Sequence, residues 1–319
     1  MNKAILIVGC GSIGRFHLLS ILRSKKNFNI TILDNAKNSL NEADVIYKEN
    51  SNNSNLKLVK NISLIDQNYD LAIVAVSSDI RLKIFKELVK HTKIKYYVLE
   101  KFLFQKTLEY YEAKEIIKDN KLKVWVNCWR RSFNIYKQVK KNLKKNEKIN
   151  MTITGNEWGL ACNSIHFIDL FCWMNNYKSI ILKNDDLKNE IKDSKRKGFV
   201  EFYGTLIGIK NENSIYMHCK ESDKKSLVIE LKTNNKRIEI NELKGTLKIT
   251  LRNKKKLIKF DSPRVSDLTY PIINDILNFK KCLLPTYNES AKLHLIILNS
   301  MIDKAQKIKK NKINYLKIT

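Results

Sequence analysis

Short hydrophobic runs of strand length alternate with amphipathic segments over the first 128 residues. Runs of about four to eight apolar residues, bounded by polar turns, are typical of strands in a sheet that is covered on both faces. After the first run, Leu18, Ile21 and Leu22 recur at helical spacing. The predicted strands cover residues 5–8, 29–34, 69–76, 95–104 and 123–128. This alternation predicts a doubly wound, parallel α/β sheet.

The second half of the chain has a pattern typical of an α+β domain. Helices are predicted over residues 166–174, over residues 266–281 and beyond Pro285. The strand candidates between them lie at residues 198–209, 214–219, 226–232, 236–240, 245–251 and 256–260. Their polar connections predict hairpins. We therefore predict a Rossmann domain over residues 1–123 and an α+β domain over residues 124–319.

A glycine-rich turn follows the first predicted strand. Its glycines have the spacing Gly-x-Gly-x-x-Gly, and the turn leads directly into the first predicted helix. Glycine lets the backbone bend sharply and leaves room for a pyrophosphate, which the N–H groups and the helix dipole then face. The predicted cofactor-binding residues of the turn are Gly9, Gly11, Ser12, Ile13 and Gly14.

An acidic residue closes the second predicted strand. Asp34 lies twenty residues after Gly14, where a dinucleotide-binding fold places the carboxylate that accepts hydrogen bonds from the ribose. A carboxylate there repels the additional phosphate of NADP. Asp34 therefore predicts that NAD is preferred over NADP. The nearby Lys37 is the one residue here that favours NADP.

A bacterial lipoprotein signal is a competing interpretation of the same stretch. Residues 6–10, after Lys3, resemble the cleavage box of such a signal. The apolar segment from Ala4 to Val8 is shorter than the roughly 7 to 15 residues that a signal core needs. We therefore favour the nucleotide-binding interpretation.

Polar residues also follow two later strands. In a doubly wound sheet, ligands lie at the carboxyl ends of the strands, so Val76, Ser77 and Ser78 are predicted to line the same crevice as the glycine turn. A helix N-cap is the structural alternative for either serine. Glu100 and Lys101 stand at the end of the next strand. Glu100 is assigned to cofactor binding.

The chain is strongly basic, with a formal net charge of +28. Such an excess raises the possibility of nucleic-acid or anionic-membrane binding. The lysines, however, are dispersed among abundant asparagine and isoleucine, and neither a recognition motif nor interleaved aromatic residues accompany them. We expect no nucleic-acid partner, and leave open an association with acidic sugar nucleotides or lipid headgroups.

The cysteine pattern bears on location and metal binding. The six cysteines are scattered, without a Cys-x-x-Cys pair or a His/Cys cluster, so we expect reduced thiols, a cytoplasmic protein and no metal site. No apolar run approaches the roughly 18 residues of a membrane helix. We expect no membrane span.

With these motifs in order, the chain resembles the Gfo/Idh/MocA family of NAD(P)-dependent oxidoreductases. The resemblance rests on the glycine turn with Asp34, on residues 75–78, on Glu100-Lys101 where the family has Glu-Lys-Pro, and on residues 127–131. Residues 159–170 look like the second-domain motif of the family. The resemblance implies a large, mostly antiparallel sheet that is open on one face and forms homodimers or homotetramers.

The second-domain motif departs from the family pattern. It keeps a helical histidine, His166, and an aspartate, Asp169, three residues later. The aspartate that the family usually has four residues before the histidine is absent, since Cys162 stands there and Asn163 follows. In the first domain, Phe102 replaces the proline after Glu-Lys.

The resemblance implies hydride transfer between nicotinamide and a hydroxyl-bearing carbon of a sugar or sugar derivative. Lys101 matches the catalytic lysine of the family, and His166 is the second candidate for exchanging the hydroxyl proton. By composition alone, Lys101 is one surface lysine among many and His166 is a structural helix residue. The expected substrate-binding residues are Lys101, Arg130, Trp158, Asn163 and His166.

Two other functions remain as alternatives. A nucleotide-binding sensor or assembly protein with degenerate catalysis would explain Phe102 and the absent aspartate. A basic nucleic-acid binder is the third hypothesis. If the chain is an enzyme, a nucleotide sugar destined for surface polysaccharide is one substrate to consider. His17, on the first helix, is assigned to the architecture of the nucleotide turn.

Overall fold

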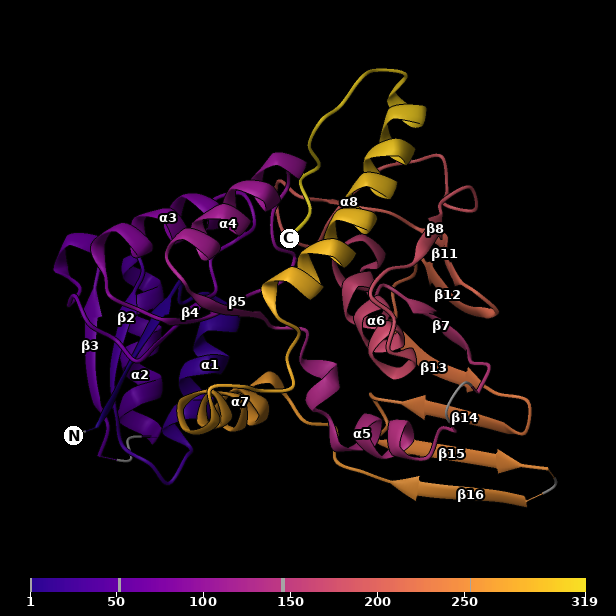
Figure 1. The fold of residues 1–319 in the computed structure, drawn as a ribbon, viewed down its shortest axis with the longest axis horizontal. Coiled ribbons are helices and arrows are strands. Elements are labelled where there is room, and N and C mark those ends of the chain that lie inside the picture. Colours follow the sequence, from indigo (N-terminus) through magenta and orange to yellow (C-terminus); the bar gives the residue numbers. More distant parts are fainter. Residues whose placement is uncertain (1, 51–52, 145–146, 253) are drawn as a thin grey trace. The chain divides into compact units, whose positions relative to one another are not determined.

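The computed structural model describes residues 2–50, 53–144, 147–252 and 254–319. The chain forms two compact units, labelled by element in Figure 1. The first unit consists of Met1–Phe104, Leu108–Ser132 and Pro263–Asn288. The second unit consists of Gln105–Thr107, Phe133–Ser262 and Glu289–Thr319.

The first unit is built on a parallel sheet of six strands in the order β3-β2-β1-β4-β5-β6. The strands are β1 (Lys3–Val8), β2 (Phe28–Leu33), β3 (Asn55–Val59), β4 (Leu71–Val74), β5 (Tyr96–Leu99) and β6 (Lys123–Val126). The helices between them are α1 (Ser12–Leu22), α2 (Lys37–Asn50), α3 (Arg81–His91) and α4 (Thr107–Asp119). This topology confirms the predicted Rossmann fold.

Burial explains why the strands of the first unit are continuous apolar runs. Residues 5–8 of β1 and 71–74 of β4 are all buried, as expected for a parallel sheet covered on both faces. The order of the strands reverses between β1 and β4, so their carboxyl ends form the switch point where such sheets bind ligands. The structure differs from prediction at β3, which was not predicted, and at the strands predicted to reach residues 76, 104 and 128, which end at Val74, Leu99 and Val126.

A helix from late in the chain belongs to the first unit. This helix, α7 (Val265–Phe279), packs against α1. The backbone N–H of Tyr270 donates a hydrogen bond of 3.0 Å to Ser20 Oγ, and the ring of Tyr270 meets Phe28 edge to face at 6.3 Å. The observed units therefore differ from a division of the chain at residue 123, because α7 buries its apolar side against α1.

The second unit contains a mixed sheet of eight strands in the order β16-β15-β14-β13-β7-β12-β11-β8. The strands are β7 (Asn150–Asn156), β8 (Ile181–Lys183), β11 (Gly204–Lys210), β12 (Asn213–Lys220), β13 (Ser226–Lys232), β14 (Lys236–Asn241), β15 (Thr246–Leu251) and β16 (Lys254–Lys259). Neighbours are antiparallel except β7 and β12. The mostly antiparallel second sheet is therefore confirmed, although β7 was not predicted.

One face of this sheet is buried and the other is open. Residues alternate between buried and more exposed along β13 and β14. The remaining elements are the two-stranded ribbon of β9 (Lys192–Asp193) and β10 (Val200–Glu201), and the helices α5 (Asn134–Lys141), α6 (Leu160–Asn175) and α8 (Tyr287–Lys309). Within the described ranges, no helix has both the length and the apolar character needed to cross a bilayer.

Candidate functional site

The glycine turn joins the end of β1 to the start of α1. Gly9 has φ +87°, and a Cβ there would lie 2.8 Å from the backbone N of Val76. A Cβ on Gly14 would lie 2.0 Å from the carbonyl oxygen of Gly9. Packing therefore requires glycine at both positions.

The middle glycine of the turn has a different environment. A Cβ on Gly11 would meet nothing within 4 Å, so the backbone of the turn is open on that side. Gly11 precedes α1, and it has no side chain with which to cap the first N–H groups of the helix. Ser12 and Ile13 lie in this first turn. Uncapped N–H groups beside open space fit the pyrophosphate of a dinucleotide.

The carboxylate of Asp34 reaches the glycine turn. Its Oδ2 accepts a hydrogen bond of 2.6 Å from the backbone N–H of Cys10, and its Oδ1 accepts one of 2.8 Å from Ala36. Burial, and then the charge of Asp34, raise the pKa of the Cys10 thiol to about 12. Each oxygen of Asp34 still has capacity for a second hydrogen bond, as contact with ribose requires.

The turn after β4 lies against the glycine turn. Val76 is the residue that a side chain on Gly9 would strike, and the backbone N–H of Ala75 donates to the carbonyl oxygen of Val8 at 2.7 Å. Val76 and Ser77 are half-buried, and Ser78 is buried. The structure thus brings this predicted segment to the glycine turn.

Glu100 lies in a buried polar network in the first unit. Its Oε1 is 3.0 Å from His17 Nε2, and Asn127 Nδ2 donates to the same oxygen. The other ring nitrogen of His17 is 2.7 Å from the hydroxyl of Thr269, on α7. Burial by itself would raise the pKa of Glu100, but hydrogen bonds from His17 and Asn127 and the charge of Lys101 lower it overall.

Lys101 follows Glu100 at the end of β5. Its side chain is half-buried, and the peptide bond between Lys101 and Phe102 is cis. The guanidinium of Arg81 donates to the carbonyl oxygens of Phe102 and Leu103 and to that of Val76. Sequence reasoning missed Arg81. The available signal was an arginine that falls among the apolar residues of a helix beginning at the ligand-binding edge of the sheet.

The second-domain motif begins with a loop tied to the sheet of the second unit. Trp158 Nε1 donates a hydrogen bond of 2.9 Å to the carbonyl oxygen of His218, on β12. Asn163 Nδ2 donates one of 2.6 Å to the carbonyl oxygen of Trp158. Gly159, with φ +79°, begins the turn into α6. Trp158 and Asn163 are therefore brought together.

His166 lies within α6, one turn after Cys162. Both His166 and Asp169 are buried. A second acid meets this helix, because Glu201 accepts hydrogen bonds from the N–H groups of Ala161 and Phe202. Burial raises the pKa of Glu201 above its ordinary value, against the lowering effect of these hydrogen bonds. Sequence reasoning missed Glu201, which is distant in sequence from the motif.

The predicted site residues fall on both units. Lys101 and Arg130 belong to the first unit, where Arg130 is buried with its Cζ 4.6 Å from the ring centre of Trp129. Trp158, Asn163 and His166 belong to the second unit. Among the residues that the structure describes, no group of three His, Cys, Asp or Glu side chains is placed to hold a metal ion.

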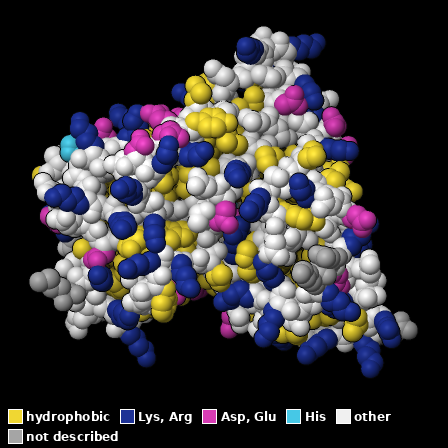
Figure 2. All heavy atoms as spheres, in the orientation of Figure 1, with side chains coloured by type: hydrophobic (Ala, Val, Ile, Leu, Met, Phe, Trp, Pro, Cys, Tyr) yellow, Lys and Arg dark blue, Asp and Glu magenta, His cyan; other side chains and the backbone are white. Residues whose placement is uncertain are grey.

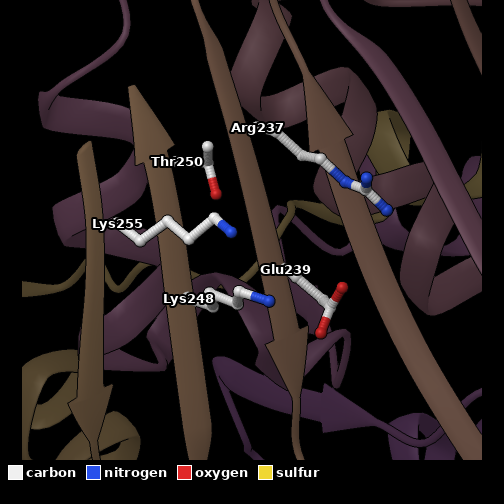
Figure 3. A pocket seen from close by; sticks show the side chains of 5 residues that line it. All are labelled: Arg237, Glu239, Lys248, Thr250 and Lys255. Atoms are coloured by element: carbon white, nitrogen blue, oxygen red, sulfur yellow. The ribbon is translucent and has the colours of Figure 1, made fainter. Parts of the chain in front are cut away.

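Basic side chains are distributed widely over the surface. Figure 2 shows lysine and arginine scattered over the visible face. In the second unit, a hollow of about 210 Å³ lies on the sheet (Figure 3) and is lined by Arg237, Glu239, Lys248, Thr250 and Lys255. These residues come from β14, β15 and β16, strands that carry none of the predicted site residues.

Residues 3–128 match the family model described as "Oxidoreductase family, NAD-binding Rossmann fold". Over these residues the chain is similar to the Gfo/Idh/MocA family. The match covers the glycine turn, Asp34, the turn after β4 and Lys101. This match confirms the resemblance seen in the sequence, and it supports an NAD-binding Rossmann fold over residues 3–128.

Solved structures similar to this chain share its fold over nearly its whole length. A dehydrogenase from Clostridium difficile is 15% identical, with a TM-score of 0.69 over 98% of this chain and 100% of that one. UDP-N-acetylglucosamine 3-dehydrogenase from Acidithiobacillus ferrooxidans is 9% identical, with a TM-score of 0.71 over 94% and 97%. A super-repressor mutant of Gal80p from Saccharomyces cerevisiae is 14% identical, with a TM-score of 0.71 over 96% and 97%. No curated protein matches the chain.

The network of Glu100 predicts a pH dependence of stability. A carboxyl group whose pKa is lowered by folding contributes stability above its ordinary pKa, near 4.5, and loses it as the pH falls through the lowered value. We expect Glu100→Gln to lower the free energy of unfolding by about 1–3 kcal/mol at pH 7. The deficit should shrink below pH 4.5.

Urea denaturation between pH 7 and pH 3 measures this difference. Glu112→Gln is the control, because Glu112 forms an exposed ion pair with Lys86, and it should cost about 1 kcal/mol or less at pH 7. A deficit for Glu100→Gln that stays constant or widens on acidification would contradict the assignment of a stabilised carboxylate.

Proposed function

We propose that the protein is an NAD(H)-dependent oxidoreductase that acts on a hydroxyl-bearing carbon of a sugar or sugar derivative. The observation that carries the proposal is the glycine turn, where the backbone N–H of Cys10 donates a hydrogen bond to the Asp34 carboxylate. Lys101 follows strand β5 of the same sheet. The family match over residues 3–128 supports a dehydrogenase or reductase.

Different residues of the first unit would bind different parts of NAD. The N–H groups of the glycine turn and of the first turn of α1 would bind the pyrophosphate. Asp34 would accept hydrogen bonds from the ribose, and Val76, Ser77 and Ser78 would line the adjacent wall. Bound nicotinamide supplies a hydride acceptor or donor.

Lys101 and His166 are the proposed proton-exchanging groups. A positioned acid or base that exchanges the hydroxyl proton contributes roughly 10²- to 10⁴-fold to the rate. Lys101 would hold the proton on its ammonium group, and His166 would bind the hydroxyl or share the proton. Because Cys162 replaces the family aspartate, the proton must be exchanged with a reduced set of groups.

The proposed substrate is a carbohydrate. A carbohydrate is supported by the family resemblance and by the fold shared with a UDP-N-acetylglucosamine dehydrogenase. Arg130 would bind a carboxylate or phosphate of the substrate, and Trp158 and Asn163 would contact its body. A nucleotide sugar for surface polysaccharide fits these groups. With six free cysteines, a cytoplasmic location fits as well.

Replacing Lys101 by methionine tests the catalytic assignment. After a substrate is found by screening sugars and nucleotide sugars at the nicotinamide absorbance band, we expect Lys101→Met to lower kcat by about 10²- to 10⁴-fold. NADH affinity, measured by fluorescence titration, should stay within about threefold, since the amides of the glycine turn are unchanged. Lys83→Met, an exposed position on α3, is the control, and equal turnover in both variants would disprove the assignment.

Asp34 predicts the choice between the two cofactors. We expect NADH to bind about 10- to 100-fold more tightly than NADPH, because the carboxylate repels the additional phosphate. Asp34→Asn should narrow this ratio while the residue can still accept hydrogen bonds. Titration of both cofactors measures it, and a wild-type preference for NADPH would contradict the NAD assignment.

A nucleotide-binding sensor or assembly protein is the alternative function. Phe102 and Cys162 favour it, and the fold is shared with a repressor, Gal80p. The wild-type protein distinguishes the two functions: a sensor binds NADH without turning over any sugar of the screen, whereas the enzyme turns over a sugar and loses this turnover when Lys101 is replaced.

The open face of the second sheet is the proposed contact of a homodimer or homotetramer. Tyr216 and Leu257 are exposed on this face, and the cross-strand register runs from Tyr216 through Thr152, Glu230, Glu239 and Lys248 to Leu257. Light scattering should give two or four times the mass of one chain. Tyr216→Asp should weaken association and Leu64→Asp, exposed in the first unit, should not. A monomeric wild type would rule out the assembly.

A further inference from the structure

Arg81 is one of the largest fully buried side chains of the first unit, with only 1% of its surface exposed. It is the first residue of α3. Nη2 donates a hydrogen bond of 2.5 Å to the carbonyl oxygen of Val76. Nη1 donates to the carbonyl oxygens of Phe102 and, at 2.8 Å, Leu103. One guanidinium therefore bridges two chain segments that are more than twenty residues apart.

The bridged segments have no regular structure of their own. Residues 102–104 follow β5 with their side chains fully buried, so their carbonyl groups need hydrogen-bond donors within the protein. A lysine offers a single nitrogen, whereas the planar fork of arginine reaches carbonyls in two directions at once. Arg81 is the first residue of α3 and Val76 lies just before this helix, so its guanidinium can reach Val76 as well as the turn after β5.

Both segments belong to the site. Val76 packs against Gly9 in the glycine turn, and Lys101 precedes the carbonyl groups that Arg81 holds. We propose that Arg81 is a positioning residue that ties the cofactor-facing turn after β4 to the turn that carries Lys101, so that the two turns move as one. The value of this tie for catalysis rests on the proposed role of Lys101, but the tie itself is measurable without turnover.

Tyr110 provides a matched control. Its hydroxyl bonds to the backbone of Phe104, at 3.0 Å to the carbonyl oxygen and 3.3 Å to the N–H, and it is buried. It therefore anchors the turn after Lys101 as Arg81 does, but it reaches this turn from α4. Loss of the Tyr110 hydroxyl removes hydrogen bonds to the turn after β5 alone, whereas loss of Arg81 removes hydrogen bonds to the turns after both β4 and β5.

Hydrogen–deuterium exchange on the full chain, read by mass spectrometry without cofactor, tests the link. We expect Arg81→Met to accelerate exchange about 10- to 100-fold in peptides covering both residues 75–80 and 100–105. Tyr110→Phe should accelerate only the second peptide. Arg81→Lys, which keeps the charge but not the fork, should give the same pattern with a smaller change, and it replaces Arg81→Met if that variant fails to fold.

NADH supplies the second measurement. In the wild type, NADH should slow exchange in residues 9–14, 75–80 and 100–105, and in the Arg81 variants the protection of residues 100–105 should be lost while that of residues 9–14 remains. The proposal is overturned if only one of the two turns responds to Arg81, or if exchange rises equally throughout the first unit. Absence of NADH protection at residues 9–14 in the wild type would instead refute the proposed function, and the cofactor-free comparison would still decide the role of Arg81.

Discussion

The pairing of Glu100 with His17 is the interaction on which the ligand-binding edge of the first unit depends. A carboxylate buried at the end of β5 requires hydrogen-bond donors, because an unsatisfied buried polar group costs about 1–3 kcal/mol. His17 supplies that partner from α1, and Thr269 holds the other ring nitrogen from α7. This contact links α7, from late in the chain, to α1, against which it packs.

Other polar groups at the same edge of the sheet also form hydrogen bonds within the protein. Asp34 accepts the N–H of Cys10, and Arg81 donates to carbonyls of the turns after β4 and β5. Each contact comes from a different strand or helix and lies at the carboxyl ends of the strands. The edge is thereby preorganised for a dinucleotide, since its polar groups are held in place by neighbours rather than by the ligand.

At both positions where the sequence departs from the family pattern, another residue binds the neighbouring backbone. Phe102 lacks the ring of proline, but its carbonyl oxygen is held by Arg81. At the start of α6, Cys162 stands in place of the aspartate, and the nearby acid is Glu201, which binds the N–H of Ala161. Burial raises the pKa of Glu201 above its ordinary value. The second unit thus has an acid beside the start of this helix, and this acid comes from β10 rather than from α6.

The sequence by itself determined the features that local pattern encodes. Apolar runs and glycine spacing predicted the Rossmann fold, the turn at Gly9–Gly14 and the place of Asp34, because strand, turn and helix are contiguous there. Only the tertiary structure decided the partners of Glu100 and the hydrogen bonds of Arg81. His17 and Thr269 are separated by 252 residues, and no local periodicity records which distant side chains must meet to satisfy a buried charge.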